Sequence, residues 1–299
     1  MYYDALRTFV AVVEAKSFTR AAEKLRLSQP SVSLHIKQLE HEFGSKLIDR
    51  SPKHLYVTTA GQMLYERALQ MLNLYEKTKE DIYAYNHKIT GTLHIGASFT
   101  IGEYILPVLL AEFRRRYPDV EVEVTIGNTK RIIEAVKLLQ MDIGLIEGQT
   151  SDKDLCIVPF MKDEMLLVAP TDHPLAARKS VTPDVLQDEV WVVREEGSGT
   201  RVYFDHMIRS LGIKVKKMIT LSSNQGVKES VAAGLGLTLL SKWVVRKPIR
   251  YGELKALTIH EESFPRRLSY ILPAHAERTL LIEVFLEGIS NRMDEEFSS

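Results

Sequence analysis

The sequence predicts a multidomain α+β protein with an N-terminal winged helix-turn-helix, a long linker helix and a C-terminal two-lobed α/β domain. The first sign is a pair of short helical patterns joined by a tight turn between residues 18 and 40. A heptad pattern then runs from residue 64 to residue 85, and alternating strand and helix patterns follow from residue 92. With 299 residues, 45% of them apolar and 26% charged, the chain is long enough for two or three folded domains.

The segment 18–40 has the spacing of a helix-turn-helix. Ser28 suits the N-cap of the second helix, and Pro30 suits its first turn, where a missing N–H costs nothing. The second helix has one apolar stripe, made of Val32, Ile36, Leu39 and Phe43. Its other face carries side chains suited to base edges and phosphates, namely Gln29, Ser31, Ser33, His35 and Lys37. A preceding helix with Leu6, Phe9, Val10 and Val13 would cover both.

Residues 46–61 predict a β-hairpin wing, with apolar strand positions on either side of a turn at Ser51-Pro52. Basic side chains near its tip, Arg50, Lys53 and His54, can reach a DNA backbone or minor groove; the alternative is a solvated turn. The whole chain carries no net charge, but residues 1–61 hold nine Lys and Arg against six Asp and Glu. This basic excess is modest and supports DNA binding without deciding it.

A long helix is predicted from a cap at Thr59 to about residue 86. Its apolar seam is unbroken, at Leu64, Ala68, Met71, Tyr75, Thr78, Ile82 and Tyr85. Because a lone helix cannot cover this seam, we expect a dimer that sets two reading helices at a fixed separation. The alternative is that the seam packs on the C-terminal half of the same chain.

The remainder predicts two α/β lobes with a ligand cleft between them. Strands at 92–97, 120–126 and 142–146 alternate with helices at 105–116 and 131–140, which predicts a parallel sheet with helices on both faces. A second run has strands at 165–169, 190–194, 215–221 and 237–240 with helices at 200–211 and 225–233, before a strand at 267–272 and a last helix at 276–293. The predicted domains are 1–58, 59–88 and 89–299, with lobe I at about 89–162 and 267–299 and lobe II at about 163–266.

Candidate ligand-binding residues lie where strands end in this α/β part. Ser98 and Thr100 precede one helix, and a second hydroxyl-bearing loop, made of Gly197, Ser198, Gly199 and Thr200, precedes another. Two such loops at helix N-termini form an anion site, although each alone is only a helix cap. Glu147 faces the presumed cleft and would repel an anion unless it binds an amine or is turned away. Asn224, before another helix, is a further candidate.

These residues resemble the LysR-type transcriptional regulators. The resemblance rests on Phe18, Ala21-Ala22, Leu27-Ser28-Gln29-Pro30, Ser33, Ile36, Leu39-Glu40, Gly44, Leu47, Arg50, Thr58 and Ala60-Gly61, and it continues at residues 196–201 and 231–237. Leu34 departs from the family, where Arg is common at this position. Because Leu34 lacks the bidentate guanine contact of Arg, we expect it to read a thymine methyl group or to pack.

The resemblance implies a ligand-responsive DNA-binding regulator, which we expect to be an activator, with periplasmic-binding-protein-like lobes around a small, often anionic effector. The DNA contacts it implies are Gln29, Pro30, Ser31, Ser33 and Lys53. The expected partners are a double-stranded DNA operator, the effector, RNA polymerase and further copies of the chain in a homodimer or homotetramer. Within the family the chain looks most like regulators of sulfur assimilation and cysteine synthesis. The alternatives are a regulator of another pathway, or a solute receptor, which would have a signal peptide and lack the helix-turn-helix.

Other functional classes are not favoured. The single cysteine, Cys156, excludes an intrachain disulfide framework and a multi-cysteine metal site, and we expect it to be a core thiol. The nine histidines are scattered, and no phosphate loop or nucleophile elbow is visible, so we expect no metal, no cofactor and no enzymatic activity. No apolar run approaches the length of a membrane span and the N-terminus lacks a signal-peptide pattern, which predicts a cytoplasmic protein without membrane partners.

Overall fold

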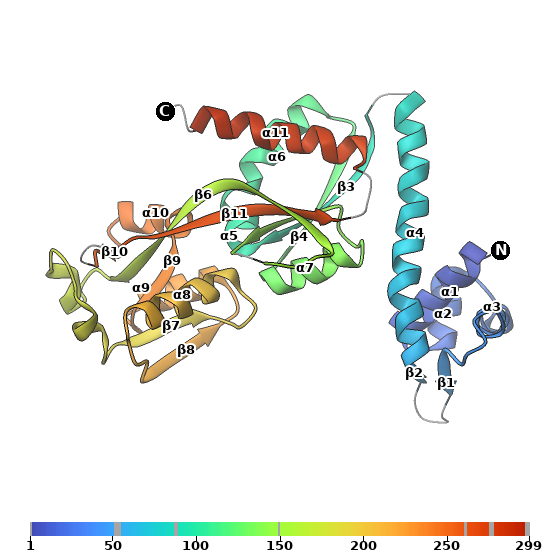
Figure 1. Cartoon of the computed structure of the whole chain (residues 1–299), viewed down its shortest axis with the longest axis horizontal. Helices are drawn as coiled ribbons and strands as arrows, with labels where there is room; N and C mark the ends of the chain where they lie inside the picture. Colours follow the sequence, from blue (N-terminus) through green and yellow to red (C-terminus); the bar gives the residue numbers. More distant parts are fainter. Residues whose placement is uncertain are drawn as a thin grey trace. The chain divides into compact units, whose positions relative to one another are not determined.

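The computed structural model describes residues 2–50, 55–86, 89–148, 150–259, 262–274 and 278–296. The chain divides into two compact units, the first containing residues 1–88 and the second most of residues 89–299 (Figure 1). Among the described residues, no helix is both long enough and apolar enough to cross a membrane. Each unit has its own hydrophobic core and is described separately.

The first unit is a winged helix-turn-helix followed by a long helix. Its elements are α1 (Tyr2–Ala15), α2 (Phe18–Leu25), α3 (Gln29–Glu42), β1 (Ile48–Arg50), β2 (Leu55–Val57) and α4 (Thr59–Asn86). The predicted N-cap of α3 is confirmed, because the Ser28 side chain accepts a hydrogen bond from the Ser31 N–H. The apolar stripe of α3 is confirmed at Val32, Ile36 and Leu39, which are buried. It is wrong at Phe43, which caps the end of α3 and is 50% exposed.

Helix α4 differs from its prediction at its N-cap and along its apolar seam. Thr58, one residue earlier than predicted, is the cap, because its Oγ1 accepts a hydrogen bond from the Gly61 N–H at 2.9 Å. The first seam residues, Leu64 and Ala68, are buried in the core of the first unit, whereas Met71 and Ile82 are 52% and 60% exposed. The seam is therefore split between the core of its own domain and an open apolar face. The side chain of Tyr85 and residues 51–54 of the wing lie outside the described part.

The first lobe of the second unit contains β3 (Gly91–Ser98), α5 (Phe99–Tyr104), α6 (Leu106–Arg116), β4 (Val120–Gly127), α7 (Thr129–Lys137), β5 (Ile143–Glu147) and α11 (Leu280–Glu296). Strand β3 pairs in parallel with β4 on one side and β5 on the other, as predicted. The buried side chains of Leu93, Ile95, Leu145 and Phe285 belong to its core. The predicted helix at 105–116 is preceded by α5, a separate short helix.

The second lobe contains β7 (Val190–Arg194), α8 (Gly199–Ser210), β8 (Lys217–Leu221), α9 (Asn224–Ala232), β9 (Thr238–Ser241), α10 (Lys242–Arg250) and β10 (Leu254–Leu257). Short 3₁₀ helices, Pro174–Ala177 and Pro183–Leu186, precede β7. Strands β7 and β8 are parallel, and the side chains of Trp191, Val193 and Phe204 are buried in the core beside them. Helix α10 and strand β10 were not predicted from the sequence.

Two long strands run through both lobes, β6 (Leu155–Pro170) and β11 (Phe264–Pro273) (Figure 1). They pair antiparallel in a sheet of order β10-β6-β11-β5-β3-β4, with β9 also on β6. The main sheet is therefore mixed: β3, β4 and β5 pair in parallel as predicted, whereas the antiparallel pairing of β6 and β11 was not predicted. The physical reason is that the apolar runs at 155–160 and 165–169 form one continuous strand. Cys156, in that strand, is partly buried and packs against the first-lobe core.

Candidate functional site

Helix α3 presents polar side chains at its N-terminal end. Gln29 and Pro30 are exposed, and the Gln29 side-chain amide donates to Ser33 Oγ at 3.1 Å, which holds these two side chains together. The Ser31 hydroxyl lies 2.8 Å from that of Ser28, beside the helix cap. Lys37 is exposed further along the helix. The structure thus places the predicted reading residues on one accessible end of α3.

Leu34 and His35 differ in how they meet the rest of the first unit. Leu34 is 56% exposed and does not belong to the core of the first unit. His35 was expected to point outward, but it is half-buried and its Nδ1 lies 2.8 Å from the hydroxyl of Thr8 in α1. Because that hydroxyl donates to the Asp4 carbonyl, it accepts from His35, and the histidine braces α3 against α1. Lys53 lies outside the described residues, and Arg50 lies in β1 with its side chain outside the described part.

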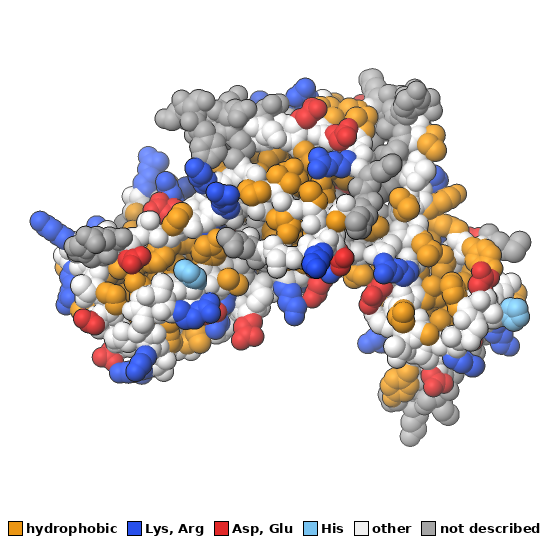
Figure 2. Space-filling view, in the orientation of Figure 1, with side chains coloured by type: hydrophobic (Ala, Val, Ile, Leu, Met, Phe, Trp, Pro, Cys, Tyr) orange, Lys and Arg blue, Asp and Glu red, His pale blue; other side chains and the backbone are white. Residues whose placement is uncertain are grey.

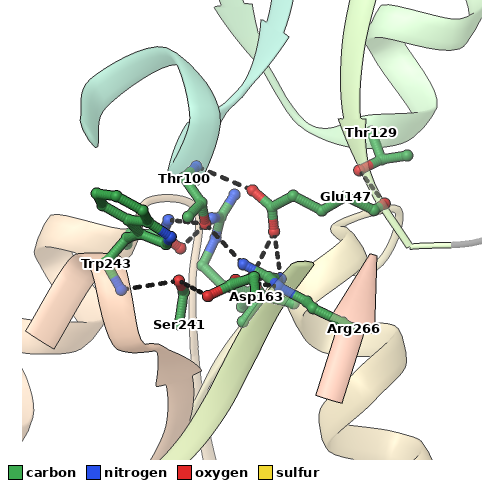
Figure 3. Close-up of polar contacts among 10 residues, drawn as sticks. Thr100, Thr129, Glu147, Asp163, Ser241, Trp243 and Arg266 are labelled. Atoms are coloured by element: carbon green, nitrogen blue, oxygen red, sulfur yellow. Dashed lines mark hydrogen bonds and ion pairs between the residues drawn. The ribbon is translucent and has the colours of Figure 1, made fainter. Parts of the chain in front are cut away.

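The predicted cleft residues meet in the second unit (Figure 3). Glu147 ends β5, and its carboxylate accepts a hydrogen bond from the Thr100 N–H at 2.9 Å. The Thr200 hydroxyl, in the first turn of α8, donates to the same carboxylate at 2.9 Å. Asn224, at the start of α9, donates from its amide to Thr100 Oγ1 at 3.1 Å. Thr100, Glu147, Thr200 and Asn224 are all buried.

Arg266, which the sequence analysis did not single out, holds this group together. Its guanidinium donates from Nη1 to Glu147 at 2.7 Å and from Nε to Asp163 at 2.6 Å. Burial alone would raise the pKa of Glu147, but Arg266 and the hydrogen bonds from Thr100 and Thr200 outweigh it and hold that pKa below 4.5. Burial alone would lower the pKa of Arg266, but Glu147 and Asp163 raise it. Glu147 is therefore an ionised, paired carboxylate.

A second buried arginine, Arg194, lies at the end of β7 and was also missed. It donates to Asn224 Oδ1 at 2.6 Å and forms two hydrogen bonds with Glu195, at 2.8 and 3.0 Å. Its guanidinium carbon lies 4.4 Å from the ring centroid of Phe99, in the first lobe. Two buried arginines, Arg194 and Arg266, therefore lie among the predicted site residues.

The glycines of the 197–200 loop allow the lobes to approach closely. A Cβ on Gly199 would lie 2.4 Å from the Glu147 carbonyl oxygen, which no side chain tolerates. Gly197 has φ +86°, and its carbonyl accepts a hydrogen bond from the Lys130 N–H at 3.1 Å. Ser198 is buried at the N-cap of α8, and its side chain forms no cap hydrogen bond.

The hydroxyl of Ser98 remains open for a ligand. It is buried at the N-cap of α5 and has no hydrogen-bond partner among the described residues. Nearby, a groove of about 360 Å³ reaches Glu147 and Gly199 and is lined on its other side by α7 residues, including Thr129 and Lys130. The groove gives a small molecule access to the Glu147 end of the cleft. Among the described residues, no cluster of three or more His, Cys, Asp and Glu is placed to hold a metal ion.

Both units match families of known proteins. Residues 3–62 match the family described as "Bacterial regulatory helix-turn-helix protein, lysR family", and residues 86–294 match the family "LysR substrate binding domain". The chain is 55% identical to the "HTH-type transcriptional regulator CysL" of Bacillus subtilis (strain 168) over 286 residues, 96% of each chain.

Solved structures have the same fold. A full-length OxyR variant from Pseudomonas aeruginosa has a TM-score of 0.75 and 24% identity, covering 97% of this chain and 94% of that chain. The regulatory domain of Synechocystis PCC6803 CcmR in complex with 2-PG has a TM-score of 0.64 and 27% identity, covering 68% of this chain and 98% of that domain.

Proposed function

Because the chain belongs to the LysR family of transcriptional regulators, we propose that it binds an operator as a homodimer or homotetramer and activates transcription in response to a small anion. The single observation that supports an anionic effector is the set of hydrogen-bond donors around the Glu147 carboxylate. As a regulator bound to double-stranded DNA, it would act in the cytoplasm and contact RNA polymerase there. The helix-turn-helix match favours this role over that of a solute receptor.

The DNA contact is proposed to come from the N-terminal end of α3. Gln29 and Ser33 present hydrogen-bonding groups to base edges, while Pro30 and Ser31 lie at the same helix end, whose N–H groups favour a phosphate oxygen. Lys37, Arg50 and Lys53 supply charge for further phosphates. The exposed Leu34 is proposed to contact a thymine methyl group. Base contacts set sequence preference, and phosphate contacts set affinity and orientation.

The effector is proposed to compete with Glu147 for its donors. The Thr100 N–H, the Thr200 hydroxyl and Arg266 already hold one carboxylate, so their geometry suits an oxyanion. Arg266 faces two carboxylates, Glu147 and Asp163, and adding a further anion beside them would be unfavourable. If Glu147 turns into the adjoining groove, an incoming oxyanion keeps the charge balance and also gains the Ser98 hydroxyl. Ser198, Gly197, Gly199 and Asn224 would complete the site.

The pathway we propose is sulfur and cysteine metabolism. It is supported by the resemblance noted in the sequence and by the 55% identity to the regulator named CysL. A regulator of the same family serving another pathway is the second candidate. In either case ligand binding would favour one arrangement of the lobes and so change how the oligomer sits on its operator.

The DNA-binding proposal is tested with Gln29→Ala combined with Ser33→Ala. Losing two side chains that contact bases should weaken binding to a DNA fragment selected by the unmodified protein by about tenfold or more. A gel-shift titration at fixed salt measures this affinity. His41→Ala, at the exposed C-terminal end of the same helix, is the control and should bind like the unmodified protein. Unchanged affinity and sequence preference in the double variant would show that α3 does not read the operator.

A further inference from the structure

A second cavity lies at the junction of the two lobes. We call it the hinge pocket; it has a volume of about 450 Å³ and is lined by Met161, Lys162, Asp163 and Glu164 of β6 and by Lys242, Trp243 and Arg246 of α10. Trp243 belongs to the second lobe but packs against the core of the first. An occupant of the hinge pocket would therefore touch both lobes. The size is that of a site for a small organic molecule.

The charges of the hinge pocket favour an anion. Lys242 and Arg246 form no hydrogen bond or ion pair with any residue that the structure describes. Of the two carboxylates, Asp163 is buried and already bound by Arg266. Glu164 alone is exposed. Lys242 and Arg246, two unpaired cations, thus outnumber the exposed Glu164, and an anion is the complementary ligand.

The apolar groups of the hinge pocket favour a ligand with an apolar body. Trp243 and Met161 are half-buried and supply an apolar wall. The Arg246 guanidinium carbon lies 4.5 Å from the centroid of the Trp243 ring, which fixes the cation at the edge of that wall. An inorganic anion would leave the wall unused. A small organic carboxylate can bury its apolar part there and place its charge between Arg246 and Lys242.

A continuous line of contacts joins the hinge pocket to the cleft (Figure 3). The backbone N–H of Trp243 donates to Ser241 Oγ at 3.1 Å, and the Ser241 hydroxyl donates to Asp163 at 3.0 Å. Asp163 accepts from Arg266 at 2.6 Å, and Arg266 donates to Glu147 at 2.7 Å. A shift of the α10 N-terminus therefore reaches the carboxylate that occupies the cleft.

We propose that the hinge pocket binds a small organic carboxylate and is a second regulatory site, coupled to the cleft through Asp163 and Arg266. Binding in the hinge pocket is independent of the function proposed above, whereas the coupling rests on the cleft being the effector site. The two claims are therefore tested separately, and neither test uses DNA.

Trp243 provides a direct signal for binding. The chain has two tryptophans, and Trp191→Phe leaves Trp243 as the sole indole. Cyclohexanecarboxylate is the probe, because it has one charge and an apolar ring and does not absorb where indole does. We expect a saturable change in Trp243 emission, and none from cyclohexylmethanol or inorganic phosphate. Calorimetric titration of the unmodified protein with the same probe repeats the test should Trp191→Phe fold poorly.

Matched variants of α10 locate the site. Lys242→Gln combined with Arg246→Gln should weaken probe binding by about tenfold or more, because two ion pairs at a partly exposed site together contribute about that factor. Lys247→Gln combined with Arg250→Gln makes the same charge change on the same helix outside the pocket and should bind normally. Absence of saturation at millimolar probe, or equal binding by both double variants, overturns the site.

Glu147→Gln tests the coupling. Because this variant changes the far end of the contact line without touching the hinge pocket, coupling predicts a changed affinity for cyclohexanecarboxylate, by about fivefold or more. Glu103→Gln, an exposed carboxyl of α5 outside that line, should leave the affinity as it is. Equal affinity in Glu147→Gln and the unmodified protein overturns the coupling.

Discussion

Glu147 places its carboxylate among groups that would otherwise be available to a bound oxyanion. Its side chain is 2% exposed, and its charge is compensated by Arg266, which is equally buried. A buried pair of this kind adds little net stability, but removing one partner costs about 3–5 kcal/mol because a charge is left uncompensated. In this site Asp163 remains as a partner for Arg266, so the loss of Glu147 should cost less.

The pH dependence of the second unit should change in Glu147→Gln. The folded pKa of Glu147 lies below its ordinary value of 4.5, so the carboxylate stabilises the fold above that pH. Its contribution is lost as the pH falls through the folded pKa. Glu147→Gln should therefore be less stable than the unmodified protein at pH 7, and the difference should shrink toward about pH 3.

Tryptophan emission during urea unfolding measures this stability, because Trp191 and Trp243 both belong to the second unit. Glu164→Gln is the control, since Glu164 is an exposed carboxylate of β6. It should leave the pH profile of the unmodified protein intact. A constant gap between Glu147→Gln and the unmodified protein from pH 7 to about pH 3 would contradict an ionised, stabilising Glu147.

Position along the chain predicted Thr100, Glu147 and Thr200 as neighbours, because each lies where a strand gives way to the next loop or helix. Arg266 could not be found in this way, since it lies 119 residues from Glu147 in a strand of the last segment. The available signal was the pair Arg266-Arg267 within a strand. Successive strand residues face opposite sides, so one of the two had to point inward.

At the scale of elements, α4 packs into the first unit over its N-terminal part and exposes apolar side chains further along. Leu64 and Ala68 pack into the first unit, and Tyr3 of α1 donates to Glu76 at 2.5 Å. This hydrogen bond raises the pKa of Tyr3 to about 12. Apolar side chains along α4 are also exposed, as Figure 2 shows. The exposed apolar residues are Met71, Leu74, Tyr75 and Ile82, of which Tyr75 also packs against the ring of Tyr3.

The open half of α4 should be a dimer contact. Met71→Glu combined with Ile82→Glu would bury like charges in a symmetric interface, so we expect the oligomer to dissociate. Sedimentation velocity measures the mass, and Met71→Leu with Ile82→Leu is the control that keeps an apolar face. If the glutamate variant keeps the mass of the unmodified protein, α4 does not hold the copies together.

Elements with a clear period were predicted well, and the errors have physical causes. Helix α10 is short, rich in basic residues and contains Pro248, so its sequence lacks the pattern of a regular helix. Strand β6 was predicted only over its C-terminal part, residues 165–169, because exposed Lys162 and Glu164 interrupt its apolar run. Both errors concern segments at the junction of the two lobes, where side chains contact both lobes.

At the scale of the whole molecule, DNA binding and effector binding should affect one another equally. A small oxyanion that binds the cleft should raise the midpoint of thermal unfolding, and inorganic sulfate, sulfite and thiosulfate are suitable probes. A probe that does so should change operator affinity by about 5–150-fold, and saturating operator DNA should change probe affinity by the same factor.

Thermal melts and gel shifts with each probe provide the two affinities. Ser98→Ala with Thr200→Ala removes two cleft hydroxyls and should abolish the response while operator binding without the probe persists. A probe that raises the melting midpoint through these hydroxyls yet leaves operator affinity unchanged would separate ligand binding from regulation.

Asp163 and Arg266 stand opposite each other in the register of β6 and β11, the two strands that run through both lobes. Neighbouring β-strands are twisted relative to one another, and the size of this twist varies. The ion pair between Asp163 and Arg266 joins the two strands that connect the lobes. Any rotation of one lobe against the other turns the guanidinium, whose remaining donors point at Glu147 and Thr100. The same side chain would therefore link a rotation of the lobes to the position of the Glu147 carboxylate.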